Sequence, residues 1–266
     1  MTDRHILFET RDDGIAVLTL NRPDFLNSFS HEMISDWHRY LIEFDENPDL
    51  NVLIVTAKGR AFSAGGDIKA LAKGEGFIGE PKEDLWSNAF KRKEALWGNI
   101  QKIALKMEEI DKPVLSCING AAIGAGLDMA LMCDIRFCAE HAKLGEGYIN
   151  LGLVPGDGGG YFLPKLVGIP KALEMLWTGD RIKTEEALRI GLVDYVYPAE
   201  EIFDRTMDFA NVLNSKPQQT VRMMKRLVKS HHKVDLRTHL DMVSSHMAVV
   251  TDTNEYIELL EQMKKS

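Results

Sequence analysis

The chain has 266 residues, with 32 Lys and Arg against 40 Asp and Glu, which gives a formal net charge of −8 at pH 7. This acidic balance argues against a nucleic-acid partner, because affinity for nucleic acid comes mainly from Lys and Arg that neutralise phosphates. Hydrophobic residues at 45% and charged residues at 27% are typical of a globular chain and exclude a disordered or fibrous one.

The cysteines and the lack of long apolar runs indicate in which cellular compartment the protein is found. Cys117, Cys133 and Cys138 contain no Cys-x-x-Cys pair and are too few for a disulfide framework, which favours a reducing environment. The first residues form no apolar run of signal-peptide length, and no stretch of about 20 apolar residues predicts a membrane-spanning helix. We therefore expect a soluble, cytoplasmic protein with no membrane partner.

Hydrophobic periodicity predicts alternating strands and helices. Ile6 to Glu9 and Ile15 to Leu20 flank a turn at Asp12-Asp13-Gly14 and read as a hairpin. A helix follows whose apolar face ends before Asn47-Pro48, with Met33, Ile34, Trp37, Leu41 and Phe44 on that face. Short apolar runs typical of buried parallel strands occur at 52–57, 114–118 and 135–138, with a weaker one at 193–197. The pattern predicts an α/β fold.

Two other regions differ from this alternation. Residues 70–84 carry glycines, a proline and charges, and are expected to form an excursion between a strand and a helix. The next stretch predicts one amphipathic helix through Leu96, Ile100, Ile103, Met107 and Ile110. From about Pro198 onward only helical patterns remain, so the last part of the chain is expected to be helical.

Two segments share a design that can hold an anion. Residues 52–57 and 114–118 are apolar strands, and each leads through small residues into a helix start, at 58–69 and 119–131. A helix start offers unpaired N–H groups, and two such loops that converge can grip one oxygen between two donors. The alternative is that the glycines only turn the chain. A phosphate cradle is disfavoured, because neither segment carries the Gly-Lys-Ser/Thr or the Gly-x-Gly-x-x-Gly pattern.

The residues of these segments resemble the crotonase (enoyl-CoA hydratase/isomerase) superfamily. The similarity lies in AFSAGGDIK at 61–69, NGAAIGAGLD at 119–128 and LGLVPGDGG at 151–159, with NRP at 21–23, NSF at 27–29 and ALRIGLV at 187–193 in support. The resemblance implies a spiral of ββα turns, with an acyl-CoA-binding core over 1–198 and a C-terminal helical oligomerisation region over 199–266. It also implies a homotrimer or a dimer of trimers, with coenzyme A as part of the substrate and no metal or further cofactor.

Carried over to this chain, the resemblance assigns the oxyanion N–H donors to Gly66 and Ala125, where Ala125 replaces the usual glycine. Backbone groups along the CoA adenine and pantetheine would come from Ala64, Asp67, Ile68 and Lys69. The CoA phosphates would meet Arg22 and Lys58. A thioester carbonyl that gains charge as an enolate needs fixed donors at that oxygen.

The acid and base residues depart from the family pattern. Asp128 occupies the position of the first family glutamate and is shorter by one methylene, while Tyr148 occupies the second, where a phenol is a poor base at neutral pH. Two nearby acids can compensate: Glu146, and Asp157, near which dienoyl-CoA isomerases and aroyl-CoA dehalogenases place an aspartate that matches Gly156. The alternatives are a helix cap for Asp157, a solvated or structural acid for Glu146, and a helix-dipole partner for Asp128.

The resemblance implies hydration of a 2-enoyl-CoA as the first hypothesis. Double-bond isomerisation is the near alternative, since one carboxylate can shuttle the proton there. A non-catalytic oligomeric CoA-ligand-binding protein is the alternative from another class, with RNA binding disfavoured by the net charge. His232, His239 and His246 recur every seven residues, which on a helix is one face and is typical of a surface stripe rather than a metal site.

Overall fold

The computed structural model describes residues 4–72 and 88–265, so most of the excursion expected over 70–84 lies outside the described residues. In the described chain a large sheet has six strands in the order β1-β2-β3-β5-β7-β10. Only the β1–β2 hairpin is antiparallel, and the other neighbours are parallel. The strands are β1 (Ile6–Thr10), β2 (Ile15–Leu20), β3 (Val52–Ala57), β5 (Val114–Ile118), β7 (Ile135–Ala139) and β10 (Tyr195–Tyr197).

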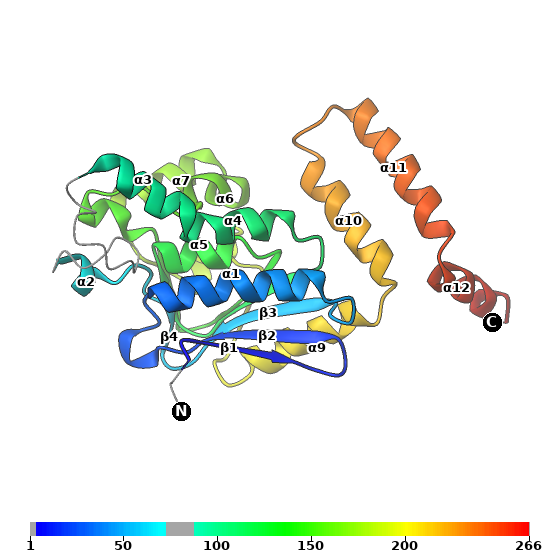
Figure 1. The fold of residues 1–266 in the computed structure, drawn as a ribbon, viewed down its shortest axis with the longest axis horizontal. Helices are drawn as coiled ribbons and strands as arrows, with labels where there is room; N and C mark the ends of the chain where they lie inside the picture. The colour runs from blue at the N-terminus through cyan, green and yellow to red at the C-terminus, as the bar shows by residue number, and fades with distance from the viewer. Residues whose placement is uncertain (1–3, 73–87, 266) are drawn as a thin grey trace.

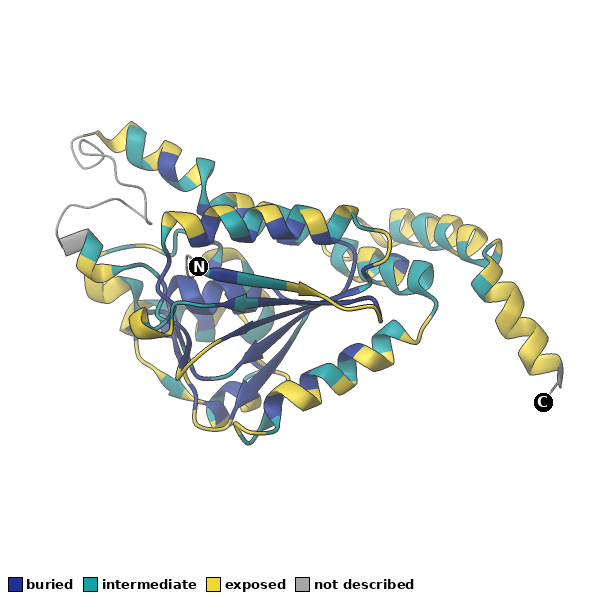
Figure 2. Ribbon diagram, turned by 60° about the horizontal axis from the view of Figure 1, so that its bottom comes forward, coloured by how far each residue is buried: buried dark blue, intermediate teal, exposed yellow. Residues whose placement is uncertain are grey.

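Helices cover both faces of the large sheet. The helix α1 (His31–Glu46) begins at Ser30, whose hydroxyl accepts from the Met33 N–H, and it packs beside α4 (Ile100–Glu109) on one face. The helix α9 (Ile202–Asn214) lies on the other face, where Ile202 and Ala210 are buried against the strands. Every residue of β3 and β5 is consequently buried, as Figure 2 shows by the dark strands between the helices. This confirms the predicted hairpin, the predicted first helix and the apolar strands.

A second, smaller sheet runs through the segments that we expected to be loops. In the described residues it has the order β4-β6-β8-β9, with β4 to β8 parallel, and its strands are β4 (Ala61–Ser63), β6 (Ala121–Ile123), β8 (Lys143–Gly145) and β9 (Ile182–Lys183). The prediction of plain loops was therefore wrong for 61–63 and 121–123. Because neighbouring parallel strands end at the same edge, the turns after β4 and β6 lie side by side.

The single helix predicted from Leu96 to Ile110 is two helices, α3 (Ala89–Gly98) and α4, and that prediction was wrong. The break is at Asn99, whose φ of −123° and ψ of −96° are not helical, and whose side-chain amide donates to the Ala95 carbonyl at 2.7 Å. The break lets Ile100, Ile103 and Met107 enter the core from α4 while α3 takes another direction. The remaining helices before α9 are α2 (Ile68–Ala72), α5 (Ala125–Leu131), α6 (Gly159–Val167), α7 (Ile169–Thr178) and α8 (Thr184–Arg189).

The C-terminal part is helical, as expected, and is formed by α9, α10 (Gln218–Ser230), α11 (Leu236–Thr251) and α12 (Asn254–Lys265). Figure 1 shows α10 beside the main body and α11 and α12 extending away from it. The division at residue 198 stays a prediction. His239 and His246 lie on α11, but His232 lies in the turn before it, so the prediction that the three share one helix face was wrong. No helix in residues 4–72 or 88–265 is long and apolar enough to cross a bilayer.

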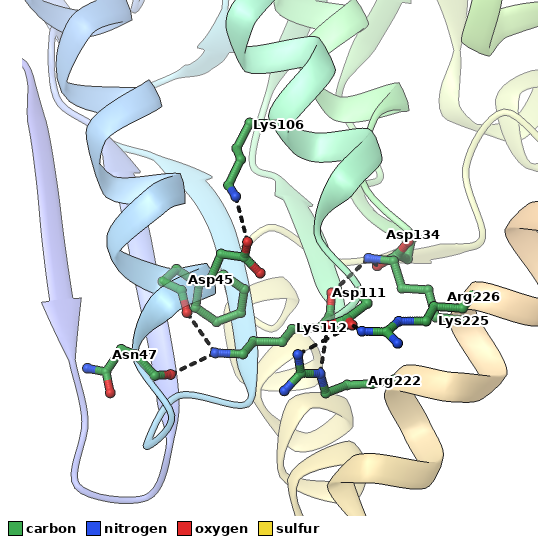
Figure 3. A network of polar contacts seen from close by, with 10 residues as sticks. Asp45, Asn47, Lys106, Asp111, Lys112, Asp134, Arg222, Lys225 and Arg226 are labelled. Carbon is green, nitrogen blue, oxygen red and sulfur yellow. Dashed lines mark hydrogen bonds and ion pairs between the residues drawn. The ribbon is translucent and has the colours of Figure 1, made fainter. Parts of the chain in front are cut away.

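Ion pairs attach α10 to the body (Figure 3). Arg222 Nε donates to Asp111 Oδ1 at 2.6 Å, and Arg226 also donates to Asp111. Lys225 Nζ donates to Asp134 Oδ2 at 2.6 Å and to the Lys112 carbonyl at 2.7 Å. We call these five side chains the α10 network: Asp111, Asp134, Arg222, Lys225 and Arg226.

Candidate active site

The two small-residue turns touch each other. Gly65 has a φ of +78°, and a Cβ there would lie 2.7 Å from the Ile123 carbonyl oxygen and 3.1 Å from the Ala125 nitrogen. On the other turn, a Cβ at Gly126 would lie 2.3 Å from the Ser63 carbonyl oxygen. A side chain at either position would force the turns apart, so the glycines are required by the close approach as well as by the turn.

Gly66 and Ala125 both line one cavity of about 180 Å³. The residues that precede them in the chain, Gly65 and Gly124, form backbone hydrogen bonds. The Phe29 N–H donates to the Gly65 carbonyl, and the Gly124 N–H donates to the Gly145 carbonyl, both at 2.8 Å. Within the described residues, by contrast, no hydrogen bond from the Gly66 or the Ala125 N–H is formed. Ala125 begins α5, where the first N–H groups of a helix have no intrahelical acceptor. The apolar wall comes from Phe29, Leu96, Leu153 and Val154.

Asn27, to which the family resemblance assigned no role, shapes the turn that contains Gly65. Asn27 is buried with a φ of +51°, and its Nδ2 donates to the Lys58 and Ala61 carbonyls at 2.9 Å each. The Ser63 hydroxyl donates to the Asn27 carbonyl and accepts from the Gly65 N–H. The signal in the sequence is a polar NS pair beside an apolar helix, but only the fold shows what it binds.

Two aspartates meet at one phenol. The Tyr148 hydroxyl lies 2.5 Å from Asp128 Oδ2 and 3.0 Å from Asp157 Oδ2. Asp128 comes from α5, Tyr148 from the 3-10 segment Gly147–Leu151, and Asp157 from the chain before α6. A phenol has one proton and can donate to one acceptor at a time. Both contacts are hydrogen bonds only when one of the two carboxyl groups is protonated and donates to the phenol oxygen.

The surroundings favour such a shared proton. Burial raises the pKa of Asp128 to about 6, against the opposing effect of the Tyr148 hydrogen bond. Burial and then the negative charge of Asp128 raise the pKa of Asp157 to about 7. Burial, followed by the charges of Asp128 and Asp157, raises the pKa of Tyr148 well above its usual value, so the phenol keeps its proton.

Glu146 completes what we call the acid cluster, made of Asp128, Glu146, Tyr148 and Asp157. Glu146 is fully buried, so the interpretation as a solvated acid was wrong. Burial and then the charge of Asp128 raise its pKa well above the usual range. Of the four residues, Tyr148 and Asp157 line the cavity, while Asp128 and Glu146 are completely buried and, in the described chain, form no part of its wall.

Two structural alternatives for these acids are excluded. The residue that precedes α6 is Gly158, and no side chain caps that helix, so the interpretation of Asp157 as its N-cap was wrong. Asp128 is more than a dipole partner, because it accepts from Tyr148 and packs against the start of α6. A Cβ at Gly159 would lie 2.2 Å from Asp128 Oδ1.

The residues expected along CoA divide into two groups. Ala64 and Ile68 line the cavity, and Ile68 is 54% exposed. Asp67 instead accepts from the Lys69 and Ala70 N–H groups at 3.1 Å each, at the start of α2. Arg22 donates to the Ser28 carbonyl at 2.5 Å, and Lys58 and Lys69 are exposed. Contacts of these residues with CoA stay predictions.

Comparisons with known proteins show which family and which fold the chain shares. Residues 10–262 match the family model described as enoyl-CoA hydratase/isomerase. The crotonyl-CoA hydratase of Syntrophomonas wolfei is 32% identical over 89% of this chain and 85% of that protein. The short-chain-enoyl-CoA hydratase of Clostridium acetobutylicum is 31% identical over 86% of this chain and 83% of that protein. The crystal structure of an enoyl-CoA hydratase from Bacillus anthracis has a TM-score of 0.87 and 30% identity, and covers 98% of this chain and 96% of its own. These matches confirm the predicted fold class.

Proposed function

Because the chain belongs to the enoyl-CoA hydratase/isomerase family, we propose that it hydrates a 2-enoyl-CoA thioester. The observation that carries this proposal is the shared cavity: Gly66 and Ala125, whose N–H groups have no acceptor in the described chain, line the same space as Asp157. The thioester oxygen binds between these N–H groups. Such donors favour the enolate over the ground state, and each lowers the barrier by roughly 3 kcal/mol.

Asp157 is the acid and base of the proposed reaction. As a carboxylate it takes a proton from water while the water oxygen bonds to Cβ and the electron pair of the double bond moves toward the thioester oxygen. The protonated Asp157 then returns the proton to Cα. A pKa of about 7 suits a group that both takes and gives a proton near neutral pH. Tyr148 orients Asp157, and Asp128 acts through Tyr148 as a positioning residue.

Double-bond isomerisation is the second candidate. Asp157 is the carboxylate that lines the cavity within the described residues, and isomerisation needs one carboxylate that removes a proton from one carbon and returns it to another. Both reactions use the same oxyanion donors, so the substrate that turns over distinguishes them.

The assembly and location are proposed on separate grounds. In the described chain α11 has no buried residue, and it exposes Leu236, Leu240 and Met247, which supports burial in a homotrimer or a dimer of trimers. Coenzyme A enters as part of the substrate, and we propose no metal or further cofactor and no nucleic-acid or membrane partner. The cytoplasmic location stays a prediction, consistent with free thiols at Cys117, Cys133 and Cys138.

The direct test is a pair of assays, with 2-enoyl-CoA substrates for hydration and 3-enoyl-CoA substrates for isomerisation, over several chain lengths. Loss of the conjugated 2-enoyl absorbance with formation of 3-hydroxyacyl-CoA supports hydration. Turnover of the 3-enoyl substrates alone supports isomerisation. Binding of both thioesters without turnover of either would support the non-catalytic alternative.

Gly65→Ala tests the paired turns. The added Cβ meets the Ile123 carbonyl and should separate the turns, which reduces kcat/KM by about 100-fold because misplacement by about 1 Å costs that much. Gly98→Ala is the control, since a Cβ at the end of α3 meets nothing within 4 Å. Equal activity of the two variants would contradict the proposed oxyanion site.

A further inference from the structure

Glu146 is a buried acid that the proposed reaction does not use. It lies between β8 and the segment Gly147–Leu151, with no exposed surface. Apart from their contact with each other, its two carboxyl oxygens and Oδ1 of Asp128 have no hydrogen-bond partner in the described part of the chain. Buried polar atoms are rarely left unpaired, and those that are call for a functional explanation.

The groups that act on Glu146 are all acidic or neutral. Asp128 faces it from α5 and Asp157 from the chain before α6, and both disfavour its ionisation. Tyr148, on its own segment, is a neutral phenol. Among the described residues, none of the groups that shift Glu146 is a Lys, Arg or His. An unpaired buried carboxylate is far more costly than a neutral acid, so Glu146 holds its proton.

A neutral carboxylic acid has one O–H group to donate, and it needs an acceptor. Asp128 is the adjacent acceptor with an unpaired oxygen, and the two carboxyl groups interact through their side chains. A proton placed between them satisfies one oxygen of each residue. It also stabilises the ionised form of Asp128, as does the Tyr148 hydroxyl that donates to Oδ2.

We propose that Glu146 is a positioning residue, a permanently neutral acid whose O–H donates to Asp128 and keeps Asp128 as the anion that accepts the Tyr148 proton. With that proton directed to Asp128, the lone pairs of the phenol oxygen face Asp157. Protonated Asp157 then donates to Tyr148, and the hydrogen bonds run in one direction from the cavity to Asp128. This inference rests on the proposed function only in giving Asp157 the catalytic role.

Two substitutions of similar size separate this role from the alternatives. Glu146→Gln keeps a neutral side chain that donates to Asp128, so kcat should stay within about twofold of wild type and its pH profile should not shift. Glu146→Met removes the donor, so kcat should fall at least about tenfold. The apparent pKa of the Asp128–Asp157 pair should also rise, because the ionised form loses a hydrogen bond.

Infrared spectroscopy tests the protonation state without turnover. The difference spectrum of wild type minus Glu146→Gln should show the carbonyl band of a protonated carboxylic acid, unchanged from about pH 5 to about pH 9 because burial holds the pKa high. Absence of that band, or a loss of activity in Glu146→Gln as large as in Glu146→Met, would overturn the proposal. An inactive wild type that still shows the band would refute the proposed reaction and leave the neutral Glu146 standing.

Discussion

The acid cluster and the α10 network both hold carboxyl groups at buried or partly buried positions, and the cost of that burial is met in opposite ways. In the α10 network each acid meets a cation: Asp111 binds Arg222 and Arg226, and Asp134 binds Lys225 (Figure 3). In the acid cluster, Asp128 and Asp157 meet at Tyr148, and Glu146 interacts with Asp128. Within the described residues none of these three carboxyl groups forms an ion pair.

The two regions therefore shift pKa values in opposite directions. Burial alone would raise the pKa of Asp111, but the hydrogen bonds from Arg222 and Arg226 outweigh it, and the pKa is lowered. In the acid cluster burial is not outweighed, and the pKa of Asp157 is raised to about 7. Compensated charges attach one element to another, whereas uncompensated acids with pKa values near neutrality, at a cavity, are typical of a catalytic site. Four predictions test this contrast.

The largest effect is expected for Asp157→Asn, which removes the acid and base at the cavity. The value of kcat should fall by about 10²- to 10⁴-fold, the usual contribution of general acid–base catalysis. Binding of a saturated acyl-CoA, measured by titration calorimetry, should persist because the cavity wall is unchanged. Asp111→Asn is the matched control and should keep its activity per folded molecule. An active Asp157→Asn enzyme would remove Asp157 from the mechanism.

Asp128→Asn should have a smaller effect, about 10- to 100-fold in kcat, since it disturbs the orientation of Tyr148 rather than the proton transfer itself. CoA binding should again be retained. The comparison with Asp157→Asn in the same assay is the measurement. A loss larger than that of Asp157→Asn would mean that Asp128, and not Asp157, meets the substrate.

In the α10 network the expected effect is on stability. Asp111→Asn replaces an anion bound by two arginines and should lower the free energy of unfolding by about 1–3 kcal/mol. The arginines are 34% and 50% exposed, so water compensates part of the loss. Denaturant unfolding at neutral pH gives the value. No change in the midpoint would show that these ion pairs do not stabilise the attachment of α10.

The smallest expected effect is a change of folding stability with pH, and its sign should differ between the two regions. Asp157 has a folded pKa of about 7, above the unfolded value of about 3.9, so its contribution to stability is complete below about pH 4 and is lost as the pH rises through 7. Asp157→Asn should thus gain stability relative to wild type between about pH 4 and about pH 8. Asp111 has a lowered folded pKa, so its contribution is present above about pH 4 and is lost in acid.

Thermal unfolding should therefore show Asp157→Asn gaining stability relative to wild type as the pH rises from about 4 to about 8. Asp111→Asn should instead gain stability relative to wild type as the pH falls below about 4, so the two differences change with pH in opposite directions. Slopes of the same sign would contradict the contrast between the two regions. Because both substitutions replace a carboxylate by an amide of the same shape, packing differences largely cancel in the comparison.

The sequence by itself indicated the family and determined the strands of the large sheet and the first helix that covers it. Apolar runs such as 52–57 and the face from Met33 to Phe44 specify their strand and helix locally, since periodicity reports which side of an element is buried. The motifs at 61–69 and 119–128 indicated acyl-CoA chemistry because the glycines, small residues and Asp128 stand at fixed spacings.

Only the tertiary structure decided how these residues meet. The pairing of β4 with β6 brings Gly65 against Ala125. The approach of α5 to α6 brings the carboxyl groups of Asp128 and Asp157 to the same Tyr148 hydroxyl. Asp157 next to a helix start looks locally like a cap, and Glu146 next to a strand looks like a surface acid. Their burial and their pKa values depend on elements that are distant in sequence, and no local pattern encodes which of those will lie beside them.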